Sequence, residues 1–451
     1  MDAVAAENRE FVLFPWSKQN TLAPLTIARA EGPYFWDADG GRYVDFSNQL
    51  VCVNAGHQHP KIVAAVKAQA ATLCYAAPSF ATEVRGRLAR LIADVTPGDL
   101  AKTYFSSGGS EAIEYAIKIA KMVTGRPKII ARYRSYHGAS SGAVSLTGDA
   151  RRPHNEPGMV GALHAFSPLC YHCTFGHKPD SCARECVGAI EELIEFENPD
   201  FIAAIIVEPI TGPANNLIVP VDDYLPRLRA LCDKYGILLI ADEIMSGWGR
   251  TGRWFGVDHY GVVPDILVTA KGLTNSAVPL GATVVSERIA AFMDENTLWS
   301  GSTYSGHALA CAAGIAAIGV YRDEGLIENS ARLGEVLLGA LEALKEKHGC
   351  VGDVRGKGLF SGIELVSDRA TRAPLLPDRT EAFFAASGGL GRIKKALADN
   401  GVYVYLRPNM LGIAPALCIT EDQLLDGLAR IDKVLDVADS LIADSRAAAT
   451  Q

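Results

Sequence analysis

Two short apolar runs in this chain each end in a charged residue, an acid in the first and an amine in the second. Residues 236–241 lead into Asp242, and residues 266–270 lead into Lys271. Both runs are too brief and too rich in branched side chains for buried helices, which predicts two buried strands. Because open α/β sheets bind ligands at the carboxyl ends of their strands, we expect Asp242 and Lys271 at one crevice.

An acid and an amine at one crevice suit the chemistry of pyridoxal phosphate. Lysine can form a Schiff base with the aldehyde of this cofactor. A carboxylate can keep the pyridine nitrogen protonated, so that the ring accepts electrons from the substrate. The alternative interpretation of Asp242 and Lys271 is an ion pair between two strand ends.

Two loops have the composition of a phosphate site. In the first, Gly108 and Gly109 allow a close approach of the backbone, and Ser110 falls near the start of an amphipathic run at 111–121. Free amide groups and the helix dipole would then face an anion, although a plain helix entry has the same pattern. The second loop, residues 301–307, precedes an alanine-rich helix that is expected from about residue 308.

Two further residues follow predicted strands. Tyr136 comes after the strand predicted at 128–133 and could stack on an aromatic cofactor, or be a half-buried loop tyrosine. Glu208 closes the apolar run 202–207. Since an unpaired carboxylate is costly to bury, we expect Glu208 to accept hydrogen bonds in the same crevice.

Taken in order, these segments resemble the class III, or ω-, aminotransferases of fold type I. The resemblance extends from about Pro15 to the final helix, and the ordered set is far more specific than any one motif. The matching segments are Gly109–Ala112, Tyr136–Gly138, Val207–Ile210, Asp242–Ile244, Gly249–Gly252, Pro264–Ile266, Ala270–Gly272, Pro279–Ala282 and Thr303–Gly306.

The resemblance implies a role for each matching residue. Lys271 would be the Schiff-base lysine and Asp242 the partner of the pyridine nitrogen. The remaining cofactor contacts would be Gly109 and Ser110 at the phosphate, Tyr136 and Ile244 on the two ring faces, His137 beside them, Glu208 behind the lysine, and Thr303 of a neighbouring subunit at the phosphate. We expect no metal ligand among these site residues.

The chain departs from the family pattern mainly at the residues that would line the substrate pocket. Trp16 matches a pocket aromatic of the N-terminal arm, and Val51 stands where some amine transaminases have a tryptophan. Arg407 matches the mobile arginine of several ω-transaminases, whose fork suits a carboxylate or sulfonate. A surface arginine is the alternative for Arg407. The segment 107–110 also differs from the Asn-Ser-Gly-Ser of many relatives.

The implied reaction is a ping-pong transfer of an amino group from an ω-amino acid or primary amine to a keto acid such as pyruvate. A homodimer or tetramer with shared active sites would carry it out, with the freed Lys271 amine moving the proton. A racemase, decarboxylase or phospholyase is possible on the same fold. A non-catalytic homologue with a metal or redox insert is the alternative of another class, against which intact Lys271 and Asp242 argue.

The elements needed to position these residues can also be outlined. Strands alternate with helices from about 60 to 307, which predicts a mostly parallel sheet covered on both faces. We therefore expect an arm at 1–50 with a hairpin turn at 39–41, a large cofactor-binding α/β domain at 51–307, and a smaller α+β domain at 308–451. In the smaller α+β domain, strands are expected at 402–406 and 412–417 and a helix at 421–443.

Composition agrees with a globular enzyme. The chain has 451 residues, 49% of them hydrophobic and 21% charged, and a net charge of −8. No basic stripe points to nucleic acid, no apolar run reaches the length of a membrane span, and the acidic N-terminus lacks a signal pattern. We expect no nucleic-acid or membrane partner and a cytoplasmic location.

A cysteine-rich segment at 170–186 stands apart from these motifs. It contains Cys170, Cys173, Cys182 and Cys186, with His172 and His177 between them. The spacing would suit a tetrahedral zinc site, two disulfides or four free thiols, and the sequence leaves these alternatives open.

Overall fold

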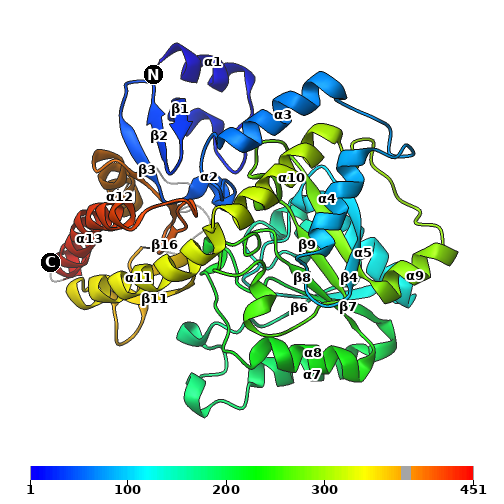
Figure 1. Ribbon diagram of the computed structural model, residues 1–451. Coiled ribbons are helices and arrows are strands. Elements are labelled where there is room, and N and C mark those ends of the chain that lie inside the picture. Colours follow the sequence, from blue (N-terminus) through cyan, green and yellow to red (C-terminus); the bar gives the residue numbers. More distant parts are fainter. Residues whose placement is uncertain (1, 377–387, 450–451) are drawn as a thin grey trace.

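Three β-sheets organise the chain in the computed structural model, which describes residues 2–376 and 388–449, with side chains up to residue 442 (Figure 1). The largest sheet has seven strands in the order β4-β10-β9-β8-β7-β5-β6. Six of them run in the same direction, and β10 runs antiparallel to both of its neighbours, β4 and β9. The mostly parallel α/β sheet is therefore confirmed. Its strands are β4 (Leu100–Ser106), β5 (Lys128–Arg132), β6 (Ala162–Ala165), β7 (Ile202–Val207), β8 (Leu238–Asp242), β9 (Ile266–Thr269) and β10 (Gly281–Ser286).

The central strands are apolar on both faces because helices cover both. Alternate residues point to opposite sides, so that Leu238 and Ile240 pack towards α5 (Gly109–Thr124), whereas Leu239 packs towards α7 (Glu185–Glu197) and α8 (Tyr224–Tyr235). The same alternation carries the next residue of this series, Asp242, to the α5 side of the sheet.

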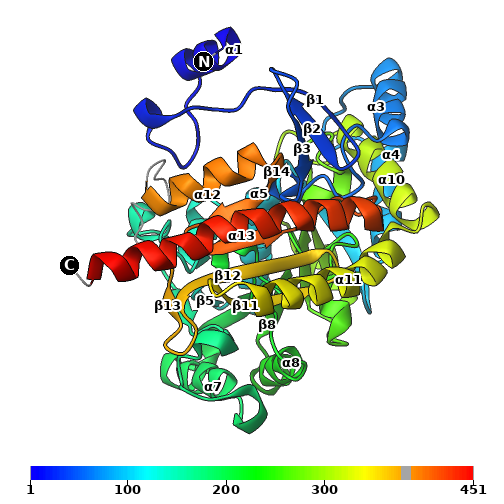
Figure 2. The same ribbon diagram turned by 90° about the vertical axis from the view of Figure 1, so that its left-hand side faces the viewer.

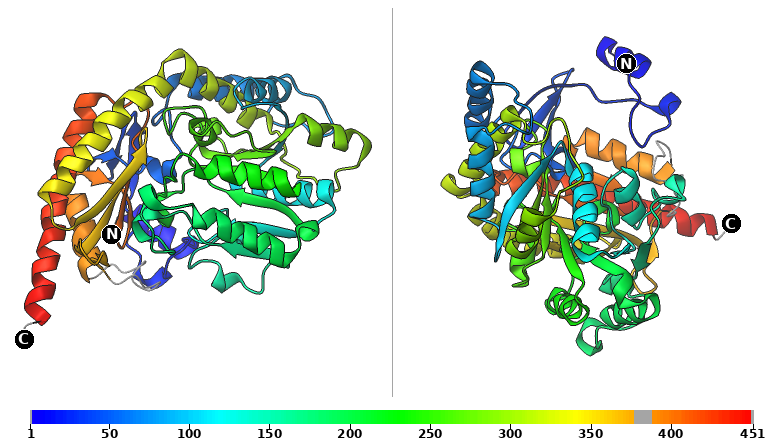
Figure 3. Two further views of the ribbon diagram at one scale, coloured as in Figure 1. Left: turned by 90° about the horizontal axis from the view of Figure 1, so that it is seen from below. Right: turned by 90° about the vertical axis from the view of Figure 1, so that its right-hand side faces the viewer.

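The remaining helices lie around this sheet and around the C-terminal region (Figures 1 and 3). α10 packs against α3 and α4, and α4 against β4. In the N-terminal two thirds of the chain they are α1 (Ala3–Phe11), α2 (Asn48–Val51), α3 (Pro60–Thr72), α4 (Glu83–Ala93), α6 (Ser141–Leu146) and α9 (Glu287–Glu295). In the last third they are α10 (Ala308–Asp323), α11 (Leu326–Lys347), α12 (Gly388–Asp399) and α13 (Glu421–Ala449).

The N-terminal arm forms a small sheet with a strand from the C-terminal region. β2 (Tyr34–Asp37) and β3 (Arg42–Asp45) pair antiparallel across the expected hairpin, and β1 (Ile27–Glu31) pairs with β2. The fourth strand, β14 (Val402–Tyr403), pairs parallel with β3. The arm and the C-terminal region thus share one sheet. Figure 2 shows α1 at the far end of the extended arm.

The third sheet belongs to the C-terminal region and has the order β11-β12-β16-β15, with β13 beside β12. Its strands are β11 (Val351–Lys357), β12 (Phe360–Asp368), β13 (Ala373–Pro374), β15 (Tyr405–Arg407) and β16 (Met410–Ile413). The strands expected at 402–406 and 412–417 are right in part. The first divides between two sheets after Tyr403, and the second starts two residues earlier and ends at Ile413. In the described ranges, no helix is long and apolar enough to cross a membrane.

Candidate active site

Lys271 and Asp242 lie at the ends of two neighbouring parallel strands. Asp242 is the last residue of β8 and pairs in register with Val268 of β9. Lys271 begins a 3₁₀ turn directly after β9, with a left-handed φ of 46°. The strand-end positions of the acid and the amine are confirmed.

The strained turn that carries Lys271 is fixed by buried polar contacts. Tyr321 Oη donates to the carbonyl of Gly272 at 2.5 Å, and Trp248 Nε1 donates to Thr269 Oγ1 at 2.5 Å. A Cβ on Gly272 would lie 2.6 Å from Nδ2 of Asn54, so only glycine fits there. These contacts hold the backbone on both sides of Lys271, which a residue at positive φ requires.

Asp242 is buried and oriented by hydrogen bonds. Its Oδ2 lies 2.7 Å from Nδ1 of His137, and its Oδ1 accepts from the backbone N–H of Ile244 at 3.1 Å. Only 3% of the Asp242 side chain is exposed. His137 thus contacts the carboxylate of Asp242, and its own contact with the cofactor stays a prediction.

The electrostatics around Lys271 combine burial with charges of both signs. Burial lowers the pKa of the Lys271 amine, the carboxylates of Asp242 and Glu208 oppose this, and the charge of Arg151 adds to it. Burial raises the pKa of Glu208, whose oxygens accept from the N–H groups of Tyr136 at 3.0 Å and Gly212 at 3.2 Å. Glu208 therefore makes the hydrogen bonds expected of a strand-end carboxylate.

Gly109, Ser110 and Ile244 meet at the first turn of α5. A Cβ on Gly109 would lie 2.8 Å from Cδ1 of Ile244, so the backbone approaches Ile244 closely. Ser110 Oγ contacts Ser140 Oγ at 2.7 Å and accepts from the N–H of Ala139 at 3.1 Å. Its hydroxyl is therefore engaged with the loop after Gly138, while the first-turn amides of the helix provide donors for a phosphate.

These residues fit pyridoxal phosphate. The amine, the carboxylate and the helix N-terminus converge at the carboxyl edge of one sheet, and a ring nitrogen of buried His137 (Nε2) has no hydrogen-bond partner in the described protein. Thr303 is elsewhere, in an exposed loop whose backbone carbonyl accepts from Tyr75 Oη at 3.0 Å. Its contact with a neighbouring subunit's phosphate stays a prediction.

Arg151 is a site residue that the sequence reasoning missed. Its Cζ lies 3.8 Å from the ring centre of Tyr136 and 5.4 Å from that of Trp16. It forms an ion pair with Asp149, with Nε 3.0 Å from both carboxylate oxygens. The segment 149–157 is polar and contains two prolines, which is the pattern of an ordinary surface loop, so no local signal marks Arg151 as a site residue.

Arg407 and Val51 have different surroundings. Arg407 Nη2 donates to Tyr405 Oη at 2.6 Å, and burial lowers the pKa of its guanidinium, with the charge of Arg151 lowering it further. Arg407 is thus a partly buried arginine near the site, not a surface one. Val51 is 1% exposed and packs in an apolar cluster with Ile210, Leu217, Phe360, Met410 and Ala414. A pocket-lining role for Val51 stays a prediction.

The side chains of the cysteine-rich segment do not form a metal-binding group in the described part of the chain. All ten cysteines are free thiols, and within 2–376 and 388–449 no group of three His, Cys, Asp or Glu side chains could hold a metal ion. Cys182 Sγ lies 2.9 Å from Glu185 Oε2, and His172 contacts Glu364. Of the three alternatives, the structure therefore has free thiols.

Glu243, next to Asp242, should make stability depend on pH. It is fully buried and accepts from Ser246, Gly256 and Val257, yet burial outweighs these bonds and raises the pKa of its carboxyl to about 7 from 4.5. The unfolded carboxyl loses its proton first, so stability should fall by up to about 3 kcal/mol as pH rises from 4.5 to 7. In Glu243→Gln, the thermal midpoint should decline less over this interval.

The control for this measurement is Glu335→Gln, which changes an exposed glutamate of α11. It should keep the wild-type pH dependence. Parallel curves for the wild type and Glu243→Gln would show that the pKa of Glu243 is the same in the folded and the unfolded protein.

Comparisons with known proteins agree with this site. The family described as aminotransferase class-III matches residues 16–435. A taurine:2-oxoglutarate aminotransferase from Bifidobacterium kashiwanohense, solved with PLP and glutamate, has a TM-score of 0.92 and 40% identity, over 97% of this chain and 98% of that one. The taurine–pyruvate aminotransferase of Bilophila wadsworthia is 33% identical, over 95% of this chain and 96% of that protein. A leucine/methionine racemase from Thermococcus litoralis is 34% identical, over 96% and 95%.

The chain therefore belongs to the class III aminotransferase family. It has the fold of the type I transaminases and uses pyridoxal phosphate to transfer an amino group between an amine and a keto acid. Transamination is favoured over the other reactions of this fold.

Proposed function

We propose that this enzyme takes the amino group of an ω-amino acid, a donor with a carboxylate or sulfonate at its far end, and passes it to a keto acid such as pyruvate. The observation that carries the proposal is a pair of guanidinium groups: Arg151 lies against Tyr136 and its charge acts on Lys271, and Arg407 is close enough to Arg151 for their charges to interact. Taurine is a substrate of the two similar aminotransferases by their names.

Arg151 has capacity for an anionic substrate. Nε and Nη2 of Arg151 contact the carboxylate of Asp149. The other terminal amino group of Arg151, Nη1, makes no hydrogen bond to a described residue. Its side chain is 11% exposed, so an anion bound there would be largely desolvated. Trp16 and Tyr136 flank the guanidinium and would cover the carbon chain of a short donor.

Each residue of the site has a task in this reaction. Bound pyridoxal phosphate supplies the electron sink that makes the substrate carbon acidic. Asp242, oriented by His137, holds the cationic form of the ring, and the first turn of α5 holds the phosphate. Lys271 Nζ, with a pKa lowered by burial, takes the proton from the substrate and returns it. Arg407 binds the carboxylate of the keto acid, and Arg151 the far acid group of the donor.

A donor panel tests the proposal. β-Alanine, taurine and a simple aryl-alkyl amine would each be supplied with pyruvate or 2-oxoglutarate, and alanine or glutamate formation measured. The acidic ω-donors should give the highest kcat/KM. Racemisation of a chiral amino acid without any keto acid would favour a racemase, and equal use of the uncharged amine would contradict the role proposed for Arg151.

Arg407→Ala should separate acidic from uncharged substrates. Removing a charged partner from a desolvated pair costs about 2–5 kcal/mol, so the half-reaction with pyruvate should slow by at least about thirtyfold. The half-reaction with an uncharged amine never needs the guanidinium and should barely change. Single-turnover kinetics that follow cofactor absorbance with each substrate would show the difference. Equal losses in both would mean that Arg407 has only a structural role.

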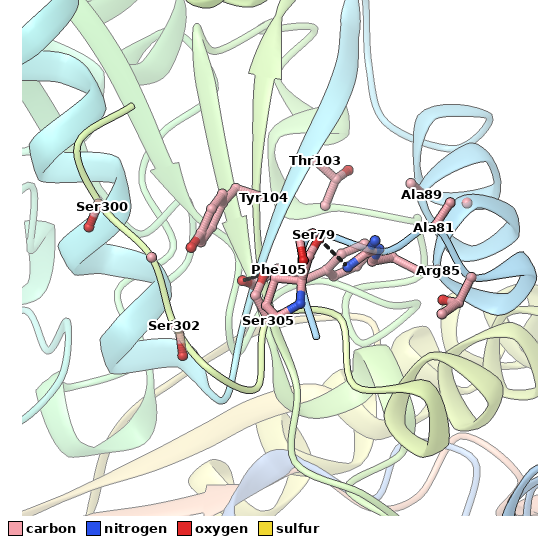
Figure 4. Close-up of a pocket in the computed structure, with 14 residues that line it drawn as sticks. Ser79, Ala81, Arg85, Ala89, Thr103, Tyr104, Phe105, Ser300, Ser302 and Ser305 are labelled. Atoms are coloured by element: carbon pink, nitrogen blue, oxygen red, sulfur yellow. Dashed lines mark hydrogen bonds between the residues drawn. The ribbon is translucent and has the colours of Figure 1, made fainter. Parts of the chain in front are cut away.

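We also propose that two subunits share each active site, in a homodimer or a tetramer of such dimers. Around the loop of Thr303 the single chain exposes large apolar side chains: 65% of Phe80, 87% of Trp299 and 58% of Tyr304. A cavity of about 660 Å³ opens between this loop and α4, lined by Arg85, Phe105 and six serines or threonines among others (Figure 4). A second copy of the chain would cover this surface, as Thr303 requires.

Trp299→Glu should weaken this assembly. Placing a charge in an apolar interface leaves it desolvated and unpaired, so sedimentation should shift towards monomer and bound cofactor should be lost with it. Phe196→Glu is a matched control, because Phe196 is 83% exposed on α7, outside this surface. A monomer with full activity at assay concentration would refute the shared site.

The ten free thiols support the cytoplasm as the location of the enzyme, because disulfides are rare there.

A further inference from the structure

The cysteine-rich segment, residues 170–186, contacts the C-terminal sheet through its first turn. His172 Nε2 lies 2.5 Å from Oε1 of Glu364 on β12. The ring of Tyr171 packs on β11, where a Cβ on Gly352 would lie 2.6 Å from its Oη, and the guanidinium of Arg372 lies 5.0 Å from its ring centre. The segment is attached to the large sheet at both ends, between β6 and α7, so this turn joins the two sheets.

Glu364 is the point where this turn meets a second contact between the sheets. Its side chain is 6% exposed, and its Oε2 accepts from Arg355 Nη2. Arg355 also donates from Nε to the carbonyl of Asn216, in the loop after Glu208, at 2.8 Å. Burial opposes ionisation of Glu364, but the bonds from His172 and Arg355 outweigh it and lower the pKa of this carboxyl. The carboxylate of Glu364 therefore pairs with His172 of the cysteine-rich segment and with Arg355 of β11.

The register of the C-terminal sheet connects Glu364 to Arg407. Glu364 is opposite Met410 of β16, and Met410 is opposite Arg407 of β15. Residues directly opposite one another share a face, so Glu364 and Arg407 are two strands, or about 10 Å, apart on the same face.

Tyr405 occupies the neighbouring row of the same face, opposite Gly412. A Cβ on Gly412 would lie 2.5 Å from Pro213 of the large domain, so the sheet packs closely against that loop. The face that presents Arg407 is thus held against the large domain at Pro213 and at Glu364, and a shift at either contact would move the guanidinium relative to Lys271.

We propose that His172 is a positioning residue, which through Glu364 fixes the sheet that carries Arg407 and so sets where the acid group of a keto acid is held relative to Lys271. The inference rests on the role proposed above for Arg407. In this role the cysteine-rich segment connects the large sheet to the C-terminal sheet, and neither a metal nor a disulfide is needed for the connection.

His172→Ala in the holoenzyme tests the proposal by single-turnover kinetics on each half-reaction. The loss of a hydrogen bond to a buried carboxylate should raise the pyruvate concentration for half-maximal rate about tenfold. The half-reaction with an uncharged amine should stay within about twofold of wild type. His172→Gln keeps an N–H donor and should recover most of the loss. His177→Ala is the matched control, since His177 lies in the same segment with 42% of its side chain exposed.

Arg407→Ala in the same experiment separates this inference from the proposed function. If His172 acts through Arg407, adding His172→Ala to Arg407→Ala should cause no further loss with pyruvate. If Arg407→Ala fails to discriminate acids, the proposed function is wrong and the inference with it. If Arg407→Ala discriminates acids but His172→Ala slows both half-reactions equally, or neither, the inference alone is overturned. A lower thermal midpoint without the selective loss would also overturn it.

Discussion

Lys271→Ala is expected to leave a folded protein that has lost its transaminase activity. Lys271 is the amine that follows β9, and proton transfer by a positioned side chain typically supplies 10²–10⁴-fold in rate. We therefore expect less than about a hundredth of the wild-type turnover, together with loss of the yellow absorbance of lysine-bound cofactor. The fold should persist, because alanine removes an amine whose charge is opposed by burial and by Arg151.

The control is Lys234→Ala, which removes an exposed lysine that pairs with Glu191 on the surface. It should be fully active. The thermal midpoint of the Lys271→Ala apoprotein should match that of the wild-type apoprotein, which would exclude misfolding as the cause of inactivity. Turnover above about one hundredth of wild type would show that another group moves the proton.

Asp242→Asn is expected to have the second-largest effect. The substitution keeps the shape of the side chain but removes the negative charge that we expect to hold the cofactor ring in its cationic form. It also removes the charge from the contact with His137. Removing one partner of a buried charge pair costs about 3–5 kcal/mol, which corresponds to a loss of roughly a hundredfold to several thousandfold in kcat.

This measurement has to be made at saturating cofactor, so that weaker cofactor binding is not mistaken for slower chemistry. Asp233→Asn is a matched control, because Asp233 is 66% exposed and pairs with Arg229 at the surface. Its kcat should not change. A kcat for Asp242→Asn within about tenfold of wild type would mean that Asp242 does not set the charge of the ring.

Much of the site could be predicted because it depends on local sequence. Asp242 and Lys271 end apolar runs whose length and branching define strands, and parallel strands bring their carboxyl ends to one edge. The glycines before α5 likewise define a helix entry within a few residues. For the same reason the hairpin at 39–41 and the mostly parallel sheet were both predicted correctly.

Contacts between distant segments could not be predicted in this way. Arg151 belongs to a polar loop that has no periodicity, and only the folded chain places it against Trp16, 135 positions earlier. His172 has the spacing of a possible zinc ligand, yet its partner is Glu364, 192 positions later. Strand β14 joins the sheet of the N-terminal arm, although its sequence continues directly into the C-terminal sheet.

Local sequence thus specifies the groups at the carboxyl edge of the sheet: a lysine, an acid and a helix start for a phosphate, each defined by its own few residues. The charges that surround Lys271 and the contacts that hold Arg407 depend instead on how the chain folds. Those contacts join two sheets and an inserted segment, and their free energy comes from burying and pairing groups that are far apart in the chain. Local pattern has no information about such pairs, because it reports only which face of an element is apolar.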